Sequence, residues 1–170
     1  MDSARGQLLI AGPALVDPNF WRTVVLVVQH NDEGALGLVL NRPADTTIGE
    51  SVPVLDELVD SDEPLFIGGP VQPSSVMVLA EFEDVGVLGT AATLDRPIPG
   101  VRSARAFAGH AGWGPQQLDG EIERGDWILE SATLADAFSA EPRGLWSEVL
   151  TRKGGSYALI ARMPPDPSMN

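Results

Sequence analysis

The sequence contains no cysteine, which excludes disulfide bonds, thiolate nucleophiles, iron–sulfur clusters and cysteine-based zinc sites. Basic charge is also scarce, because 11 lysine and arginine residues stand against 24 acidic residues and give a formal net charge of −13. Such a chain lacks the basic surface that grips a phosphate backbone, so direct binding of nucleic acid is not expected. Its single lysine, Lys153, lies outside any P-loop pattern.

Long apolar segments are missing as well. The most intensely apolar run, residues 24–28, is far too short to cross a bilayer. The first residues lack the basic region and apolar stretch of a secretory signal. We therefore expect a cytoplasmic protein that does not associate with a membrane.

Familiar catalytic patterns are absent too. His30 and His110 are the only histidines, lie far apart and belong to no HExxH motif, so a histidine-rich zinc site is not expected. No GxSxG elbow is present, which removes the nucleophile of the α/β-hydrolases. The sequence thus predicts no catalytic residue, no metal site and no cofactor.

What the chain does have is the composition of a folded domain. It has 170 residues, of which 44% are hydrophobic and 21% charged, and glycine and proline are spread along it as punctuation. We expect one domain over residues 1–170, with an irregular tail at about 164–170. β-branched runs and turn residues predict strands. The expected strands are residues 7–11, 23–30, 35–41, 65–67, 76–82, 85–94, 104–110 and 126–131.

Short amphipathic helices are expected between and after these strands. Apolar spacing, prolines at helix starts and glycines at helix ends indicate helices near 48–60, 115–124, 134–138 and 142–153, and leave 156–163 open between strand and helix. Pro43 is expected to stop the strand before it. Because strands and helices do not alternate regularly, the order predicts an α+β fold with a mixed or antiparallel sheet.

Two glycine-rich segments, 68–75 (GGPVQPSS) and 109–116 (GHAGWGPQ), are the candidate ligand loops. Free backbone N–H groups before a helix could hold a small anion, with His110, Ser74 and an acidic residue as the side chains able to do chemistry. The alternative, which we favour, is that the glycines permit tight turns and let Trp113 pack inward. The speculative ligand-binding residues are Gly68, Gly69, Ser74, Ser75, Gly109, His110, Gly112, Trp113 and Gly114.

Three further features have simpler interpretations. His30, Asp32 and Glu33 could bind a hard cation, but a solvated hairpin turn explains them. The acidic run at 56–63 lacks the central glycine of an EF-hand and is expected to be a solvated face. The four tryptophans are expected mostly in the core, although an exposed Trp, or Phe20 beside Trp21, would mark a partner surface.

Several blocks, in order and covering almost the whole chain, carry a resemblance to a known family. They are LLIAGPALVDPNFWRTVVLVVQHNDEGALGLVLNRP, PLFIGGPVQPSSVMVL, GHAGWGPQQLDGEIERGDWIL, LWSEVL and MPPDPSMN. Together they resemble the AlgH/YqgE family of uncharacterised bacterial proteins. The resemblance implies a compact α+β domain with a partly barrel-like sheet and short flanking helices, and it implies no catalytic residue and no cofactor. The family usually has Tyr at position 110 and Gly at position 116, where this chain has His110 and Gln116.

The resemblance and the residues together suggest a non-enzymatic protein that binds a protein or a small molecule. A transcription-linked regulatory role is implied only by the family name, and the acidic charge argues against direct contact with DNA. The alternative is an enzyme or small-anion-binding protein that uses segments 68–75 and 109–116. The two alternatives differ in whether these segments meet in space.

Overall fold

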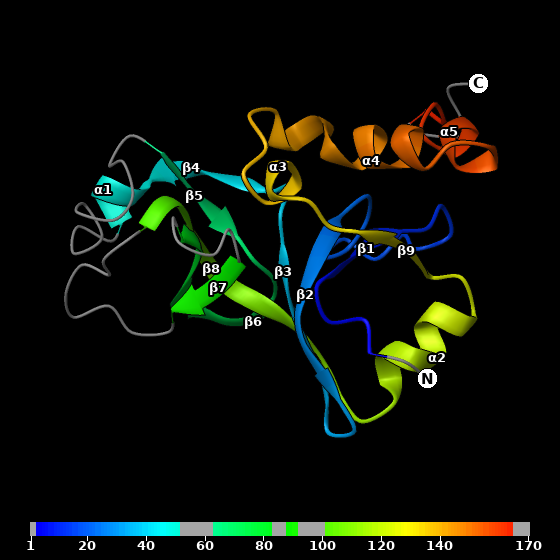
Figure 1. The fold of residues 1–170 in the computed structure, drawn as a ribbon, viewed down its shortest axis with the longest axis horizontal. Coiled ribbons are helices and arrows are strands. Elements are labelled where there is room, and N and C mark those ends of the chain that lie inside the picture. The colour runs from blue at the N-terminus through cyan, green and yellow to red at the C-terminus, as the bar shows by residue number, and fades with distance from the viewer. Residues whose placement is uncertain (1–2, 52–62, 83–87, 92–100, 165–170) are drawn as a thin grey trace.

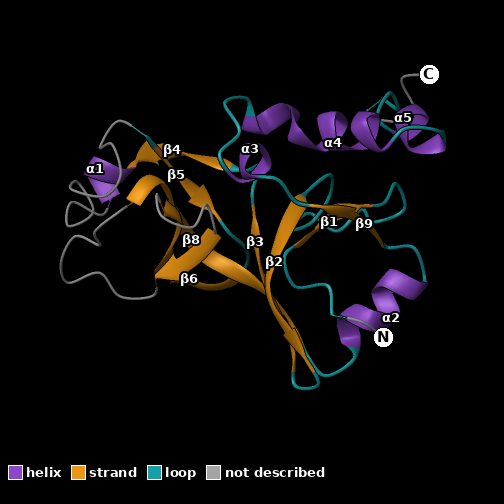
Figure 2. Ribbon diagram, viewed as in Figure 1, coloured by secondary structure: helices purple, strands orange, loops and turns teal. Residues whose placement is uncertain are grey.

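Nine strands hydrogen-bond into one sheet in the computed structural model, and short helices flank it (Figures 1 and 2). The structure describes residues 3–51, 63–82, 88–91 and 101–164. The strands are β1 (Gln7–Ala11), β2 (Val24–Asn31), β3 (Gly34–Val39), β4 (Pro43–Thr47), β5 (Pro64–Ile67), β6 (Val71–Phe82), β7 (Leu88–Ala91), β8 (Val101–Trp113) and β9 (Trp127–Ser131). The helices are α1 (Ile48–Ser51), α2 (Gln117–Glu123), α3 (Leu134–Ala137), the 3-10 turn η2 (Pro142–Gly144), α4 (Leu145–Lys153) and α5 (Ser156–Ile160).

The sheet is mixed. Its main path runs β4-β5-β8-β3-β2-β1-β9, while β6 pairs with β8 and β7 pairs with β6. Only the β5–β8 pair is parallel among the strand pairs of the described residues. The predicted α+β class, with a mixed sheet and short helices, is therefore confirmed.

The long strand β8 joins the two halves of the sheet. Its first part pairs with β5 and β6, and its last residues, Ala111 to Trp113, pair with β3. The strands at the two ends of the main path, β4 and β9, do not pair with each other in the described part of the chain. The sheet is consequently folded over but not closed, which limits its barrel-like character to a partial one.

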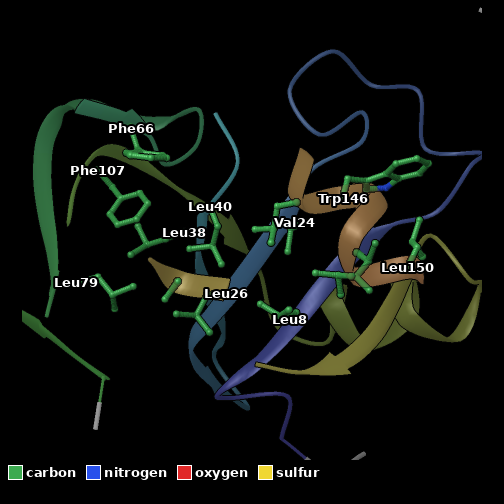
Figure 3. Packing of buried hydrophobic residues seen from close by; sticks show 14 residues of the cluster. Leu8, Val24, Leu26, Leu38, Leu40, Phe66, Leu79, Phe107, Trp146 and Leu150 are labelled. Atoms are coloured by element: carbon green, nitrogen blue, oxygen red, sulfur yellow. The ribbon is translucent and has the colours of Figure 1, made fainter. Parts of the chain in front are cut away.

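The central strands are buried on both faces, as their β-branched composition predicts. In β2, Val24 and Leu26 join a cluster under α4, whereas Val25 and Val27 join a second cluster around Trp113. Successive strand residues point to opposite faces, so these clusters are the two sides of one sheet. Figure 3 shows the first cluster, into which α4 inserts Trp146 beside strand residues.

Helix α4 exists because one of its faces is apolar and fits this cluster. Leu145, Val149 and Leu150 are fully buried, with Trp146 nearly so. Complete burial of such a side chain is worth roughly 1.5–3 kcal/mol, which exceeds the intrinsic helix propensity of a nine-residue segment. Figure 1 places α4 and α5 together over β1 and β9, at the opposite end of the molecule from α1.

Several predicted boundaries are wrong. The strand before Pro43, β3, ends at Val39 as expected, but Pro43 itself begins a strand, β4, that was not predicted. Strand β6 begins at Val71, inside the segment expected to be a loop. Likewise β8 continues through the second glycine-rich segment to Trp113, so α2 begins at Gln117 and not at 115. The ambiguous segment near the C-terminus forms helix α5.

Other predictions fall partly outside the described residues. The helix expected at 48–60 is observed only as α1, and residues 52–60 lie outside, as does nearly all of the acidic run at 56–63. The strand expected at 85–94 is observed as β7 over 88–91. Of the expected irregular tail at 164–170, only Pro164 is described.

Candidate functional site

The two glycine-rich segments meet in space. Val71 pairs with His110 across the β6–β8 ladder, and the N–H of Gly68 donates to the carbonyl oxygen of Ala108 at 2.8 Å. Ser74 and Ser75 of β6 are exposed near this junction. The segments therefore form one face, which is the condition for a shared site.

The glycines on this face are explained by close backbone packing. A Cβ on Gly68 would meet the carbonyl oxygen of Gly109, and a Cβ on Gly109 would meet that of Gly69, both closer than real side chains approach. Gly109 also has a φ of +74°, a conformation that other residues adopt at a cost. Gly68 additionally accepts from the N–H of Val39 at 2.9 Å, so this backbone is bonded to its neighbours.

The second segment ends in contacts within the protein. Trp113 is buried and donates from Nε1 to Glu121 Oε2 at 2.7 Å. The N–H of the exposed Gly114 donates to the side-chain oxygen of Gln117 at 3.0 Å, and Gly112 is exposed as well. His110 is half-buried near the C-terminal end of β8. These contacts agree with an inward-packing role for Trp113, and they leave ligand binding on this face as a prediction.

His30 is fixed near the hairpin turn by neighbours on both ring nitrogens. Its Nδ1 accepts the N–H of Ala4 at 2.8 Å, so the proton of the neutral imidazole must be on Nε2. Nε2 lies 3.0 Å from Oδ1 of Asp119 on α2. Asp32 and Glu33 are exposed at the turn. In the described residues no group of three or more His, Cys, Asp or Glu side chains could hold a metal ion.

A different site emerges at residues 12–23, the loop between β1 and β2. Arg22, near the end of this loop, has a φ of +54°, which is a left-handed conformation in a residue with a side chain. Such a conformation costs about 1–2 kcal/mol and persists only where surrounding contacts enforce it. The backbone oxygen of Arg22 accepts from Asn41 Nδ2 at 2.9 Å, which helps to hold the turn.

The strained backbone places the Arg22 guanidinium over two indole rings. Its Cζ lies 4.4 Å from the ring centroid of Trp146 and 5.2 Å from that of Trp21. Its Nη2 donates to the carbonyl oxygens of Met163 and Pro164 at 2.7 and 3.0 Å. Partial burial lowers the pKa of Arg22 from its ordinary value. The guanidinium thereby joins the loop, helix α4 and the segment after α5.

A pocket of about 120 Å³ opens beside this guanidinium. Its lining comes from the loop, from α4 and from the segment after α5. The lining residues are Gly12, Pro13, Val16, Trp21, Arg22, Trp146, Met163 and Pro164. Val16, Trp21 and Met163 are 72%, 37% and 45% exposed, and they make up half of the six large hydrophobic residues exposed in the described chain.

The loop that forms the pocket wall is anchored from outside itself. Arg42 donates to the carbonyl oxygens of Asn19 and Trp21 at 2.7 and 3.1 Å. Asp17 caps the turn from within, because its Oδ1 accepts the N–H of Asn19 at 2.7 Å. A wall held by these contacts is pre-organised, so a ligand would not have to order it.

Below the loop, Phe20 packs against an aromatic pair. Its ring centroid lies 6.4 Å from that of Trp113 and 5.7 Å from that of Trp127. Glu121 accepts from both indoles, at 2.7 and 3.0 Å. Phe20 therefore points inward while its neighbour Trp21 is exposed, which separates the two aromatics that the sequence suggested as a partner surface.

Sequence reasoning missed Arg22 and the pocket. The one sequence feature that pointed to this region is Trp21, which was considered only as part of a partner surface. Nothing in the order of the residues indicates that Met163 and Trp146 lie beside it. The residues lie on three elements that are far apart in the chain. Their meeting depends on how α4 and α5 fold back over β1.

A family model described as AlgH-like matches residues 8–158 of this chain. The chain belongs to the AlgH-like family. A UPF0301 protein of Thermobifida fusca is 41% identical over 99% of this chain and 96% of its own length. A UPF0301 protein of Streptomyces coelicolor is 37% identical over 100% of this chain and 97% of its own.

Two solved structures share the AlgH-like fold. A protein from Corynebacterium diphtheriae superposes with a TM-score of 0.81 at 27% identity and covers 96% of this chain and 94% of its own. The AlgH protein of Pseudomonas aeruginosa superposes with a TM-score of 0.73 at 27% identity and covers 98% of each chain. Within the described residues, no helix is both long and apolar enough to span a bilayer.

The AlgH-like match includes the loop and α4 but ends before the last wall of the pocket. Met163 and Pro164, which accept the two hydrogen bonds of Arg22, lie after residue 158. The pocket is therefore completed by a segment of this chain outside the matched region.

Proposed function

We propose that this AlgH-like protein is a non-enzymatic binding protein and that its ligand occupies the Arg22 pocket. The observation that carries the proposal is the gathering of three exposed apolar side chains around a strained, anchored arginine. Exposed apolar side chains that gather in one place are typical of a surface that a ligand or a partner covers. Strain held by surrounding contacts is also typical of functional sites.

A transcription-linked role would follow from such binding through a partner protein. The net charge of −13 disfavours contact with DNA, so a regulatory effect would need a ligand or protein signal. The glycine-rich face around His110 and Ser74 is the other candidate surface, as an enzyme or small-anion site. A titration with small fragments can distinguish binding at the Arg22 pocket from binding at the glycine-rich face.

The experiment is a titration of the ¹⁵N-labelled protein with small apolar fragments of neutral, anionic and cationic type, followed by heteronuclear NMR. The indole N–H signals of Trp21 and Trp146 and the backbone signal of Arg22 should shift with saturation. Val16→Asp should abolish these shifts, because a charge replaces an exposed apolar wall. Val71→Asp is the matched control, since Val71 is exposed and lies beside His110.

Each result has a definite meaning. Saturable shifts in the pocket that Val16→Asp removes and Val71→Asp preserves support the proposal. Shifts confined to β6 and β8, removed only by Val71→Asp, would move the site to the glycine-rich face. A protein that binds no fragment at either surface would contradict the proposed function.

A further inference from the structure

We infer that the Arg22 pocket selects a small monocarboxylate with a short apolar chain. This inference rests on the proposed function and adds the chemical class of the ligand. In this arrangement Arg22 receives the carboxylate, and the apolar chain lies against Val16, Trp21 and Met163.

The guanidinium has donors left for an anion. Arginine carries five N–H donors, and the two hydrogen bonds that Arg22 makes to Met163 and Pro164 both leave from Nη2. Within the described residues, Nε and Nη1 of Arg22 have no hydrogen-bond partner, so three donors remain. Donors on a charged group form the stronger class of hydrogen bond with a carboxylate.

Among the residues that the structure describes, no carboxylate forms an ion pair with Arg22. The groups that contact its guanidinium are indole rings and carbonyl oxygens, which stabilise a cation without cancelling its charge. The nearby acid of the loop, Asp17, is bonded to the Asn19 N–H and acts electrostatically on Arg42.

The volume of the pocket limits the size of the ligand. The space of about 120 Å³ is somewhat smaller than a cavity of about 150 Å³ that holds benzene. A chain of about four to six carbons therefore fits, and a long acyl chain would have to leave the pocket. The exposure of Val16 and Met163 shows that the pocket is open on that side.

The test compares three probes of one length by calorimetry and NMR: hexanoate, hexanamide and hexylammonium. Hexanoate should bind at least tenfold more tightly than hexanamide, and hexylammonium should not bind measurably. The preference for hexanoate should shrink in high salt, because part of it is a charge interaction at a partly exposed site. N-acetyl-leucinate serves as a fourth probe, which represents the C-terminus of a peptide.

The variants separate charge from shape. Arg22→Met should reduce the affinity for hexanoate at least tenfold while it leaves that for hexanamide within about twofold. Arg162→Met is the matched control, because it removes one exposed positive charge two residues after α5 and should leave both affinities unchanged. Val16→Asp keeps Arg22 intact and should abolish hexanoate binding, which preserves the test if Arg22→Met does not fold.

The outcomes distinguish this inference from the proposed function. Equal binding of hexanoate and hexanamide would overturn anion selection and leave the binding pocket in place. Tighter binding of N-acetyl-leucinate than of hexanoate would assign the pocket to peptide termini and overturn the small-molecule assignment. Concentration-dependent dimerisation that Trp21→Ala abolishes would show that a second copy covers the pocket, which would also overturn it.

Discussion

Replacement of Asp136 by Asn should destabilise the protein by about 2 kcal/mol at neutral pH. The carboxylate of Asp136 is buried, with a side-chain exposure of 2%, and receives two hydrogen bonds from Arg152 at 2.8 and 3.0 Å. It also accepts the N–H of Thr133 in the capping box of α3. Loss of one partner of a buried pair costs about 3–5 kcal/mol, and the 38% exposure of Arg152 reduces that cost.

The effect should depend on pH with a defined sign. Burial raises the pKa of Asp136, but hydrogen bonds from Arg152 and Thr133 outweigh it, so the pKa lies below its ordinary value. A carboxyl with a depressed folded-state pKa stabilises the protein above the unfolded-state pKa of about 3.9, and this contribution disappears as pH falls through the folded-state value. The difference between the wild type and Asp136→Asn should therefore narrow below about pH 4.

The assay is urea unfolding followed by tryptophan fluorescence at neutral and acidic pH. Asp126→Asn is the control, because Asp126 forms an exposed pair with Arg124 and should change the unfolding free energy by less than about 0.5 kcal/mol. A loss at Asp136 no larger than that of the control, or one that is the same at every pH, would refute this reasoning.

Three further predictions concern single contacts. Gln116→Gly should raise the free energy of unfolding, measured by urea denaturation, by about 0.5–1 kcal/mol, because Gln116 has a φ of +61° that glycine adopts without strain. An unchanged or lower free energy of unfolding would show that Gln116 is not strained. Glu121→Ala should lower the free energy of unfolding by about 2 kcal/mol and alter the near-ultraviolet circular dichroism, since it leaves the indole donors of Trp113 and Trp127 unpaired. An unchanged spectrum would contradict this role of Glu121. Lys153→Met should increase self-association measured by light scattering, because Nζ covers the Leu129 carbonyl on edge strand β9; purely monomeric behaviour at high concentration would disprove this role.

The buried strands and α4 could be predicted because their side chains report burial directly. The β-branched residues of β2 alternate between the two clusters, and the spacing of Leu145, Val149 and Leu150 places them on one helix face. These elements satisfy local propensity and the global core together, so the pattern and the structure agree.

The strands that the sequence did not predict correctly contain prolines and glycines. Whether such a residue ends a strand or lies within it depends on the strands packed beside it. Pro43 is tolerated because it is the first residue of β4, the strand at one end of the sheet. Pro73 lies in β6 where the register with β8 shifts between Val71 and Val76. Gly109 allows two backbones to approach within one sheet, so a pattern typical of a turn is part of a strand.

The pocket could not be predicted because it depends on tertiary placement. Arg22 is distinguished by its left-handed backbone conformation and by its contacts with two indole rings. One indole belongs to the loop before β2 and the other to α4. The order of residues in the sequence does not indicate that these two indoles lie against one arginine. The two glycine-rich segments, in contrast, could be singled out from the sequence, but their pairing in the sheet and the use of their glycines for strand packing could not.

The most direct test of the account is a crystal structure of the protein grown with hexanoate. The account predicts the carboxylate within hydrogen-bond distance of Nε or Nη1 of Arg22, and the carbon chain against Val16 and Met163. Either of two results would contradict the account. One is hexanoate bound on another face of the protein with the pocket empty, and the other is hexanoate in the pocket with its carboxylate turned away from Arg22.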